Sequence, residues 1–304
     1  MTTSMRKTPT HKPGRLLATG VTALAAVSLP VLSGLSPTAA AAPDHTSTGG
    51  DRVAAASCPA DQHYGQSGSC VTSLQKKLHA YYSWLDVDGK FGPQTLEAVL
   101  AYQSTRGLSV DGDAGPKTKA ALAAKKPAKH QIDRTTMAAL RALQNRNGSA
   151  CHTNTEGGKG FNSSCTGNGG QPEYWCADYV GWVWGHSGNS ETGVTAWAPT
   201  VYEYGQKHGT LHTSSSYVPR PGDAITYSDS SAVQHVGIVA AMNGPENQAV
   251  IISGDTHGTG DTQAEYASTS KVWIDVAAAG SWKVGQSPDY TRHTISSYVS
   301  PVAS

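Results

Sequence analysis

A motif that occurs twice in the first half of the chain constrains its fold more than any other feature. Its copies are Val-Asp-Gly-Lys-Phe-Gly-Pro-Gln-Thr at 87–95 and Val-Asp-Gly-Asp-Ala-Gly-Pro-Lys-Thr at 110–118. Asp-Gly favours a tight turn because Gly tolerates positive φ, and Gly-Pro favours a helix start because Pro is pre-set for the first turn. The flanking apolar residues have helical spacing, at Leu74, Leu78, Leu96, Val99, Leu100, Ala121 and Leu122. The pattern predicts a compact three-helix unit over 72–123.

This pattern resembles the three-helix peptidoglycan-binding domain found on many cell-wall enzymes. The resemblance rests on both copies of the motif and on the Ala-Tyr-Gln in the helix between them. It implies that residues 72–123 bind bacterial peptidoglycan. The repeated Gly and Pro residues explain the backbone, but they do not identify the residues that contact a ligand. The alternative is that the motif serves only as turn punctuation.

The N-terminal segment 1–42 has the order of a secretory leader. A basic start precedes an apolar run at 16–32, and Ala39–Ala42 offers a small-residue cleavage site. The apolar run is short and contains Pro30, which argues against a membrane anchor. Four of the 23 Lys and Arg residues and none of the 22 acidic residues lie in this segment, so the mature chain is slightly acidic. We therefore expect a secreted, cell-wall-associated monomer that does not bind nucleic acid or membranes.

Five cysteines set the next constraint. Export makes disulfides plausible, and proximity alone pairs Cys58 with Cys70 and Cys151 with Cys165. Each bridge would close a loop of roughly 13 to 15 residues, which stabilises a fold by about 3 kcal/mol in the chain-entropy model. Cys176 is left over. In an exported protein such a thiol is either an intermolecular bridge or a nucleophile.

Composition divides the rest of the chain. We expect linkers at 43–71, which contains the Cys58–Cys70 loop, and at 124–132, and a second domain at 133–304. In that domain a helix headed by Cys176 precedes strand-like runs, at 224–227, 235–242, 249–253 and 271–276. A helix followed by consecutive strands predicts an α+β domain with an antiparallel sheet.

Three residues are candidates for chemistry. The dipole and free N–H groups at a helix start stabilise a thiolate, which favours Cys176 as nucleophile; a buried structural thiol is the alternative. His235 begins an apolar strand and is the candidate base. The turn at Asn243-Gly244 then brings Asp255 or Thr256 beside His235, depending on a one-residue difference in register. Asp255 would fix the imidazole tautomer and stabilise the imidazolium; the alternative is an ordinary turn residue.

The same segments resemble the CHAP family of cysteine, histidine-dependent amidohydrolases and peptidases. The shared motifs are Trp-Cys-Ala-Asp-Tyr-Val at 175–180, Trp-Ala-Pro at 197–199, Pro-Gly-Asp at 221–223 and His-Val-Gly-Ile-Val at 235–239. The resemblance implies a papain-like fold, Cys176 as nucleophile, His235 as general base, and no metal or cofactor. Where the family often has Glu-x-Asn, this chain has Ser253-Gly254-Asp255, so Asp255 matches the Asn and Ser253 replaces the acid.

These features predict a peptidoglycan hydrolase that cleaves an amide through a Cys-His thioester mechanism. The bond is a muramoyl-alanine amide or a stem or cross-bridge peptide bond, and the sequence does not choose between them. Two alternatives remain. The Ser253 departure is compatible with a non-catalytic wall-binding protein that carries a degenerate hydrolase domain, and the Cys-His pair is compatible with a cysteine peptidase acting on proteins.

Overall fold

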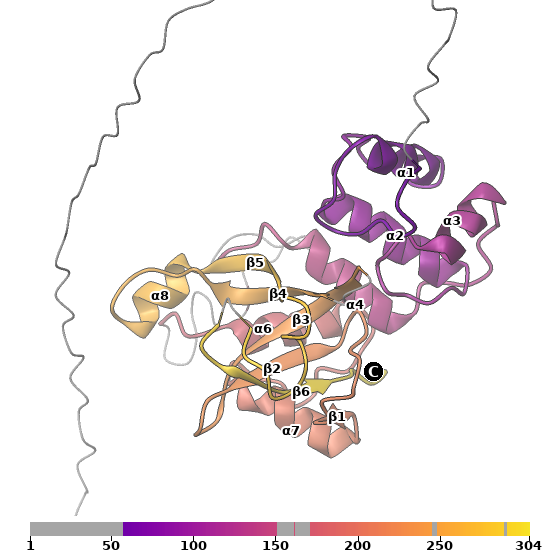
Figure 1. Ribbon diagram of the computed structural model, residues 1–304. Coiled ribbons are helices and arrows are strands. Elements are labelled where there is room, and N and C mark those ends of the chain that lie inside the picture. The colour runs from indigo at the N-terminus through magenta and orange to yellow at the C-terminus, as the bar shows by residue number, and fades with distance from the viewer. Residues whose placement is uncertain (1–56, 151–160, 162–170, 245–247, 289–290) are drawn as a thin grey trace, which may run out of the picture. The chain divides into compact units, whose positions relative to one another are not determined.

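A computed structural model describes residues 57–150, 161, 171–244, 248–288 and 291–304, and the structural statements below concern those residues (Figure 1). The predicted signal peptide at 1–42 and the predicted Cys151–Cys165 bridge lie outside them. Residues 56–304 form one compact unit. The Cys58–Cys70 disulfide is present, which confirms that pairing.

The first helices form the unit that the repeat predicted. They are α1 (Ser69–His79), α2 (Pro93–Thr105) and α3 (Pro116–Ala123). In α2 and α3 a Pro occupies the first turn and a Gly precedes it, as the motif requires.

A glutamine from the preceding helix holds each of the two Asp-Gly turns. Gln75 Nε2 donates to Asp88 Oδ1 at 2.8 Å, and its Oε1 accepts the Gly89 N–H at 2.7 Å. Gln103 makes the equivalent bonds to Asp111, at 2.6 Å, and to Gly112, at 3.0 Å. Both copies of the motif therefore form the same turn, held by equivalent hydrogen bonds.

The second part of the unit is a helix layer on an antiparallel sheet. The helices are α4 (Arg134–Gln144), α6 (Cys176–Gly185), α7 (Pro199–His208) and α8 (Gln263–Thr269). The strands are β1 (Leu211–His212), β2 (Ala224–Ser228), β3 (Val233–Asn243), β4 (Gln248–Thr256), β5 (Lys271–Val276) and β6 (Thr294–Val299). They pair in the order β1-β6-β2-β3-β4-β5. This confirms the predicted α+β layout, with a three-helix unit before a Cys-bearing helix on an antiparallel sheet.

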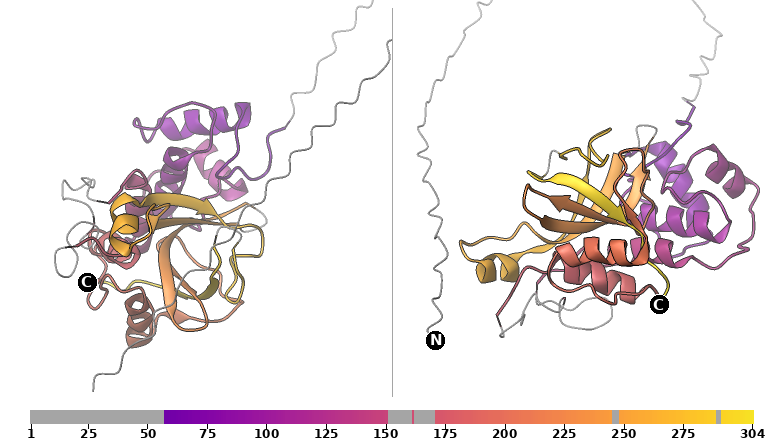
Figure 2. Two further views of the ribbon diagram at one scale, coloured as in Figure 1. Left: turned by 90° about the vertical axis from the view of Figure 1, so that its left-hand side faces the viewer. Right: turned by 90° about the horizontal axis from the view of Figure 1, so that it is seen from below.

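The helix that begins at Cys176 packs on one face of the sheet. Tyr179, Val180 and Val183 of α6 are fully buried and share a cluster with Val236 and Ile252 of the sheet. Burying each of these apolar side chains stabilises the fold by about 1.5–3 kcal/mol. Figure 2 shows the pink α6 and salmon α7 beneath the sheet in its right-hand view. This packing fixes the axis of α6 and hence the location of its first residue.

The β3–β4 hairpin carries the predicted base and acid. Next to the loop, Asn243 pairs with Gln248, and a bulge between Val239 and Ala241 then shifts the register by one residue. Beyond the bulge, Ile238 pairs with Ile252. The pairing of the two strands ends there, and His235, Asp255 and Thr256 all line one cavity beyond it.

Candidate active site

Cys176 is the first residue of α6, and its thiol lies against the start of β3. The side chain is 3% exposed and unbonded to any other described cysteine. The backbone N–H groups of Val236 and Ala177 lie close enough to the sulfur to lower the pKa of the thiol. Because Val236 directly follows His235 in β3, the thiol lies near the start of the strand that carries the predicted base.

The charge state of Cys176 differs from the sequence-based prediction. Burial, and then the charge of Asp255, raise the pKa of the thiol to about 12, and the two backbone N–H groups offset this only in part. The expectation of a stable thiolate at the helix start was wrong because desolvation outweighs the helix terminus. The raised pKa favours the protonated thiol at neutral pH.

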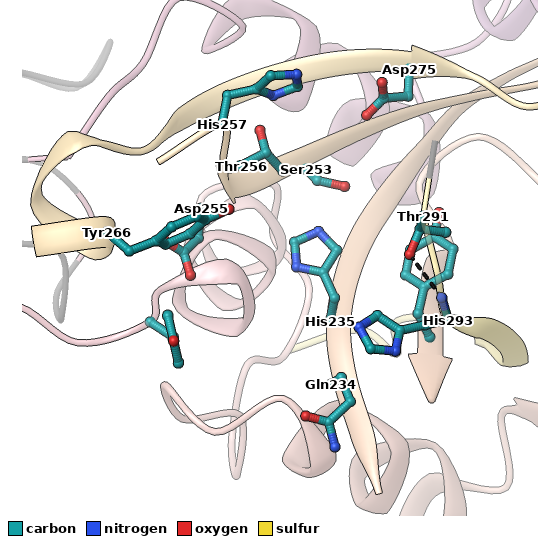
Figure 3. Close-up of a pocket in the computed structure, with 12 residues that line it drawn as sticks. Gln234, His235, Ser253, Asp255, Thr256, His257, Tyr266, Asp275, Thr291 and His293 are labelled. Carbon is teal, nitrogen blue, oxygen red and sulfur yellow. Dashed lines mark hydrogen bonds between the residues drawn. The ribbon is translucent and has the colours of Figure 1, made fainter. Parts of the chain in front are cut away.

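His235 lines a cavity of about 530 Å³ at the carboxyl end of β4. Figure 3 shows its ring pointing toward Ser253 and Asp255, with His293 alongside. Desolvation by the surrounding protein, together with the charge of His293, lowers the pKa of His235 to about 4. The imidazole is therefore neutral at pH 7, as a proton acceptor must be.

Asp255 lines the same cavity, but its hydrogen bonds are to Trp175, which precedes Cys176, and to Ser270. The residue is 5% exposed, with φ at 58°, a conformation that Asp tolerates better than most residues. Its Oδ2 accepts the Trp175 backbone N–H at 3.2 Å, and its Oδ1 accepts from Ser270 Oγ at 2.7 Å. Burial raises the pKa of Asp255 to about 7, against the lowering effect of these two donors.

Ser253, the departure from the family pattern, also lines the cavity and is 3% exposed. A Cβ added to Gly237 would clash with Ser253 Oγ and would lie 3.0 Å from Ile251 Cγ2. Gly237 is thus needed where the chain has His-Val-Gly-Ile-Val, because the strands approach closely beside the site.

A second cavity, of about 350 Å³, contains Cys176. Tyr174 and Gln234 line both cavities, so the two adjoin. Trp197, which belongs to the Trp-Ala-Pro motif, lines the second cavity and is 62% exposed. A substrate that extends through both cavities would pass the thiol and the imidazole in turn.

Sequence reasoning missed several residues of the first cavity. Tyr227, His257, Tyr266, Asp275 and His293 all line it. They come from five different segments, and no local motif marks them. A search over the described segments finds no cluster of three or more His, Cys, Asp or Glu side chains suited to a metal ion. Nor does any described helix have the length and hydropathy needed to cross a membrane.

Comparisons with known proteins agree with both resemblances. Residues 67–122 match the model of the putative peptidoglycan binding domain family, and residues 166–255 match that of the CHAP domain. A phage endolysin of Burkholderia AP3 phage is 30% identical over 33% of this chain and 42% of that chain, with a TM-score of 0.22. The match thus spans less than half of the endolysin, and no curated protein matches this chain. The chain contains a peptidoglycan-binding domain followed by a CHAP domain, in the order that its motifs predicted.

Proposed function

We propose that this protein is a secreted peptidoglycan hydrolase that cleaves an amide bond with Cys176 as nucleophile and His235 as general base. The two family matches support a peptidoglycan hydrolase. The observation that carries the catalytic assignment is that His235 and Cys176 line two adjoining cavities, with Tyr174 and Gln234 lining both.

The charge states favour proton transfer during attack over a preformed ion pair. The pKa of Cys176 is raised and that of His235 is lowered, so a neutral thiol meets a neutral imidazole. His235 takes the thiol proton as the sulfur adds to the amide carbonyl carbon. The backbone N–H of Cys176 is the first candidate donor to the resulting oxyanion.

The intermediate collapses when the carbon–nitrogen bond breaks and His235 returns its proton to the leaving amine. This leaves a thioester on Cys176. A water molecule then adds to the thioester carbonyl while His235 accepts its proton, and the carboxylic acid leaves as the thiol is regenerated. Asp255 stabilises the imidazolium in both halves of the cycle through its negative charge.

The N-terminal helices α1–α3 supply wall binding. A module that binds the insoluble polymer raises the effective concentration of the hydrolase at its substrate. Wall binding and bond cleavage are separable on this basis, since none of the three catalytic residues lies in 67–122.

The test measures binding and cleavage in the same samples. Cys176→Ala should abolish release of soluble fragments from purified walls and should still sediment with the walls. Casein, offered in parallel, should remain uncut by the unaltered protein. Wall digestion by the alanine variant would refute the nucleophile assignment, and rapid casein cleavage would favour a protein-directed peptidase.

A further inference from the structure

Ser270 lies where several segments around the nucleophile meet. It follows α8, is fully buried, and accepts the Ala150 N–H at 3.1 Å through its backbone oxygen. Its hydroxyl accepts the Trp175 indole N–H at 2.7 Å and lies 2.7 Å from Asp255 Oδ1, to which it donates. Ser270 is not among the residues that line either active-site cavity. Its contacts therefore act on other protein groups, not on a substrate.

Trp175 is held at two points by this arrangement. Its indole donates to Ser270 Oγ and, at 3.1 Å, to the Ala267 oxygen, while its backbone N–H donates to Asp255. The indole is fully buried and stacks on Phe161 with ring centroids 5.1 Å apart. Since Trp175 is the N-cap of α6, whatever fixes it also fixes Cys176.

We propose that Ser270 and Asp255 form a clamp on Trp175, in which Ser270 is a positioning residue that sets both the location of the nucleophile and the charge of Asp255. The inference rests on the proposed function for its catalytic consequence. Its structural part, the restraint of the Cys176 thiol, stands independently. The clamp joins β4, α6 and the end of α8 through buried polar groups, and each of these groups has its hydrogen-bond partner in the network.

Because the clamp affects the charge of Asp255, its loss should change the pH dependence of activity. Several titratable groups face it: Cys176 from α6, His235 from β3, Tyr266 from α8, and Tyr174, His257, Asp275 and His293 around the shared cavity. Donation by Ser270 lowers the pKa of Asp255, so loss of the hydroxyl should raise that pKa above about 7. The carboxyl would then be protonated at neutral pH and could no longer stabilise an imidazolium.

The experiment compares three variants of the full chain with the unaltered protein. Ser270→Ala removes the hydroxyl and Ser270→Thr keeps it. Ser268→Ala is the matched control, because Ser268 is an exposed α8 serine bonded only to Glu265. One measurement is the pH dependence of kcat/KM for release of soluble fragments from walls. The other is the rate at which iodoacetamide alkylates Cys176, followed by mass spectrometry.

For Ser270→Ala we expect the acidic limb of kcat/KM to move up by about one pH unit and Cys176 alkylation to accelerate about fivefold or more as the restraint is lost. Ser270→Thr and Ser268→Ala should match the unaltered protein in both measurements. An activity loss that is uniform across pH, with unchanged alkylation, would reduce Ser270 to a structural residue and overturn the proposal.

A second variant covers the case in which Ser270→Ala does not fold. Asp255→Asn should abolish the acidic limb near pH 7, and a limb that persists would overturn the proposal. If the unaltered protein digests no walls, the proposed function fails. The alkylation comparison still decides the clamp in that case, because equal rates for the unaltered protein and Ser270→Ala would refute it.

Discussion

The folded protein should protect Cys176 from alkylation to a degree that follows from its pKa. Burial, then the charge of Asp255, raises this pKa from an ordinary 9.0 to about 12. At a pH below the pKa, each additional pKa unit lowers the thiolate fraction tenfold. Because the thiolate is the reactive form, iodoacetamide should modify Cys176 about 1,000-fold more slowly than an exposed cysteine at pH 8.

The assay follows the peptide that contains Cys176 by mass spectrometry after timed labelling at several pH values. Labelling in urea with the disulfides intact is the control, and it should restore the rate of an ordinary thiol. Asp255→Asn should accelerate labelling of the folded protein about three- to tenfold, because it removes a negative charge beside the sulfur. Labelling of the folded protein with an apparent pKa near 7 would mean a preformed thiolate and would refute the reasoning.

Three further changes test the site and its support. His235→Ala should reduce wall digestion at least 100-fold, as expected for loss of a general base, with little change in melting temperature. Gly237→Ala should lower the free energy of unfolding by about 1–3 kcal/mol through its clash with Ser253, whereas Gly92→Ala, which meets no atom within 4 Å, should change it little. Burial raises the pKa of Glu97 from 4.5 to about 7. The contribution of Glu97 to the free energy of unfolding should therefore be complete below pH 4.5 and be lost as the pH rises through 7, by at most about 3 kcal/mol. Glu97→Gln should remove this pH dependence.

Each of these expectations has a clear contrary result, measured by urea unfolding or wall digestion. Full activity in His235→Ala would move the general base elsewhere. Equal stabilities of the two glycine variants would mean that the strands beside the site can separate without cost. A thermal-stability curve with the same pH slope in Glu97→Gln and the unaltered protein would mean that Glu97 titrates normally.

Much of the fold follows from local sequence because its determinants are local. Each Asp-Gly and Gly-Pro pair acts within a few residues, so the helix starts at Pro93 and Pro116 could be predicted. The four apolar runs after Cys176 became β2–β5. The short β1 and the Ser-rich β6 (Thr294–Val299) carry no such run. The pairing of β6 with β2, and of β1 with β6, comes from tertiary contacts.

Local sequence indicated the candidate site residues, but it did not indicate their surroundings. Asp255 and His235 line one cavity, but nothing in the sequence marks the bulge between Val239 and Ala241 or the positive φ of Asp255. Burial of the thiol depends on the sheet as a whole, which is why the predicted thiolate was wrong. The bonds from Ser270 to Trp175 and Asp255 join residues 95 and 15 positions apart, beyond the reach of spacing arguments. The role of Asp255 as orienter of His235 stays a prediction.

The covalent intermediate gives the most direct test of the proposed chemistry. Soluble muropeptides would be mixed with the full chain, quenched in acid within one turnover, and digested for peptide mass spectrometry. We predict an acyl group on Cys176 that hydroxylamine removes, together with one newly formed amine in the released fragments. Turnover without that adduct, retained when Cys176 is replaced by Ser, would contradict a thioester mechanism at this site.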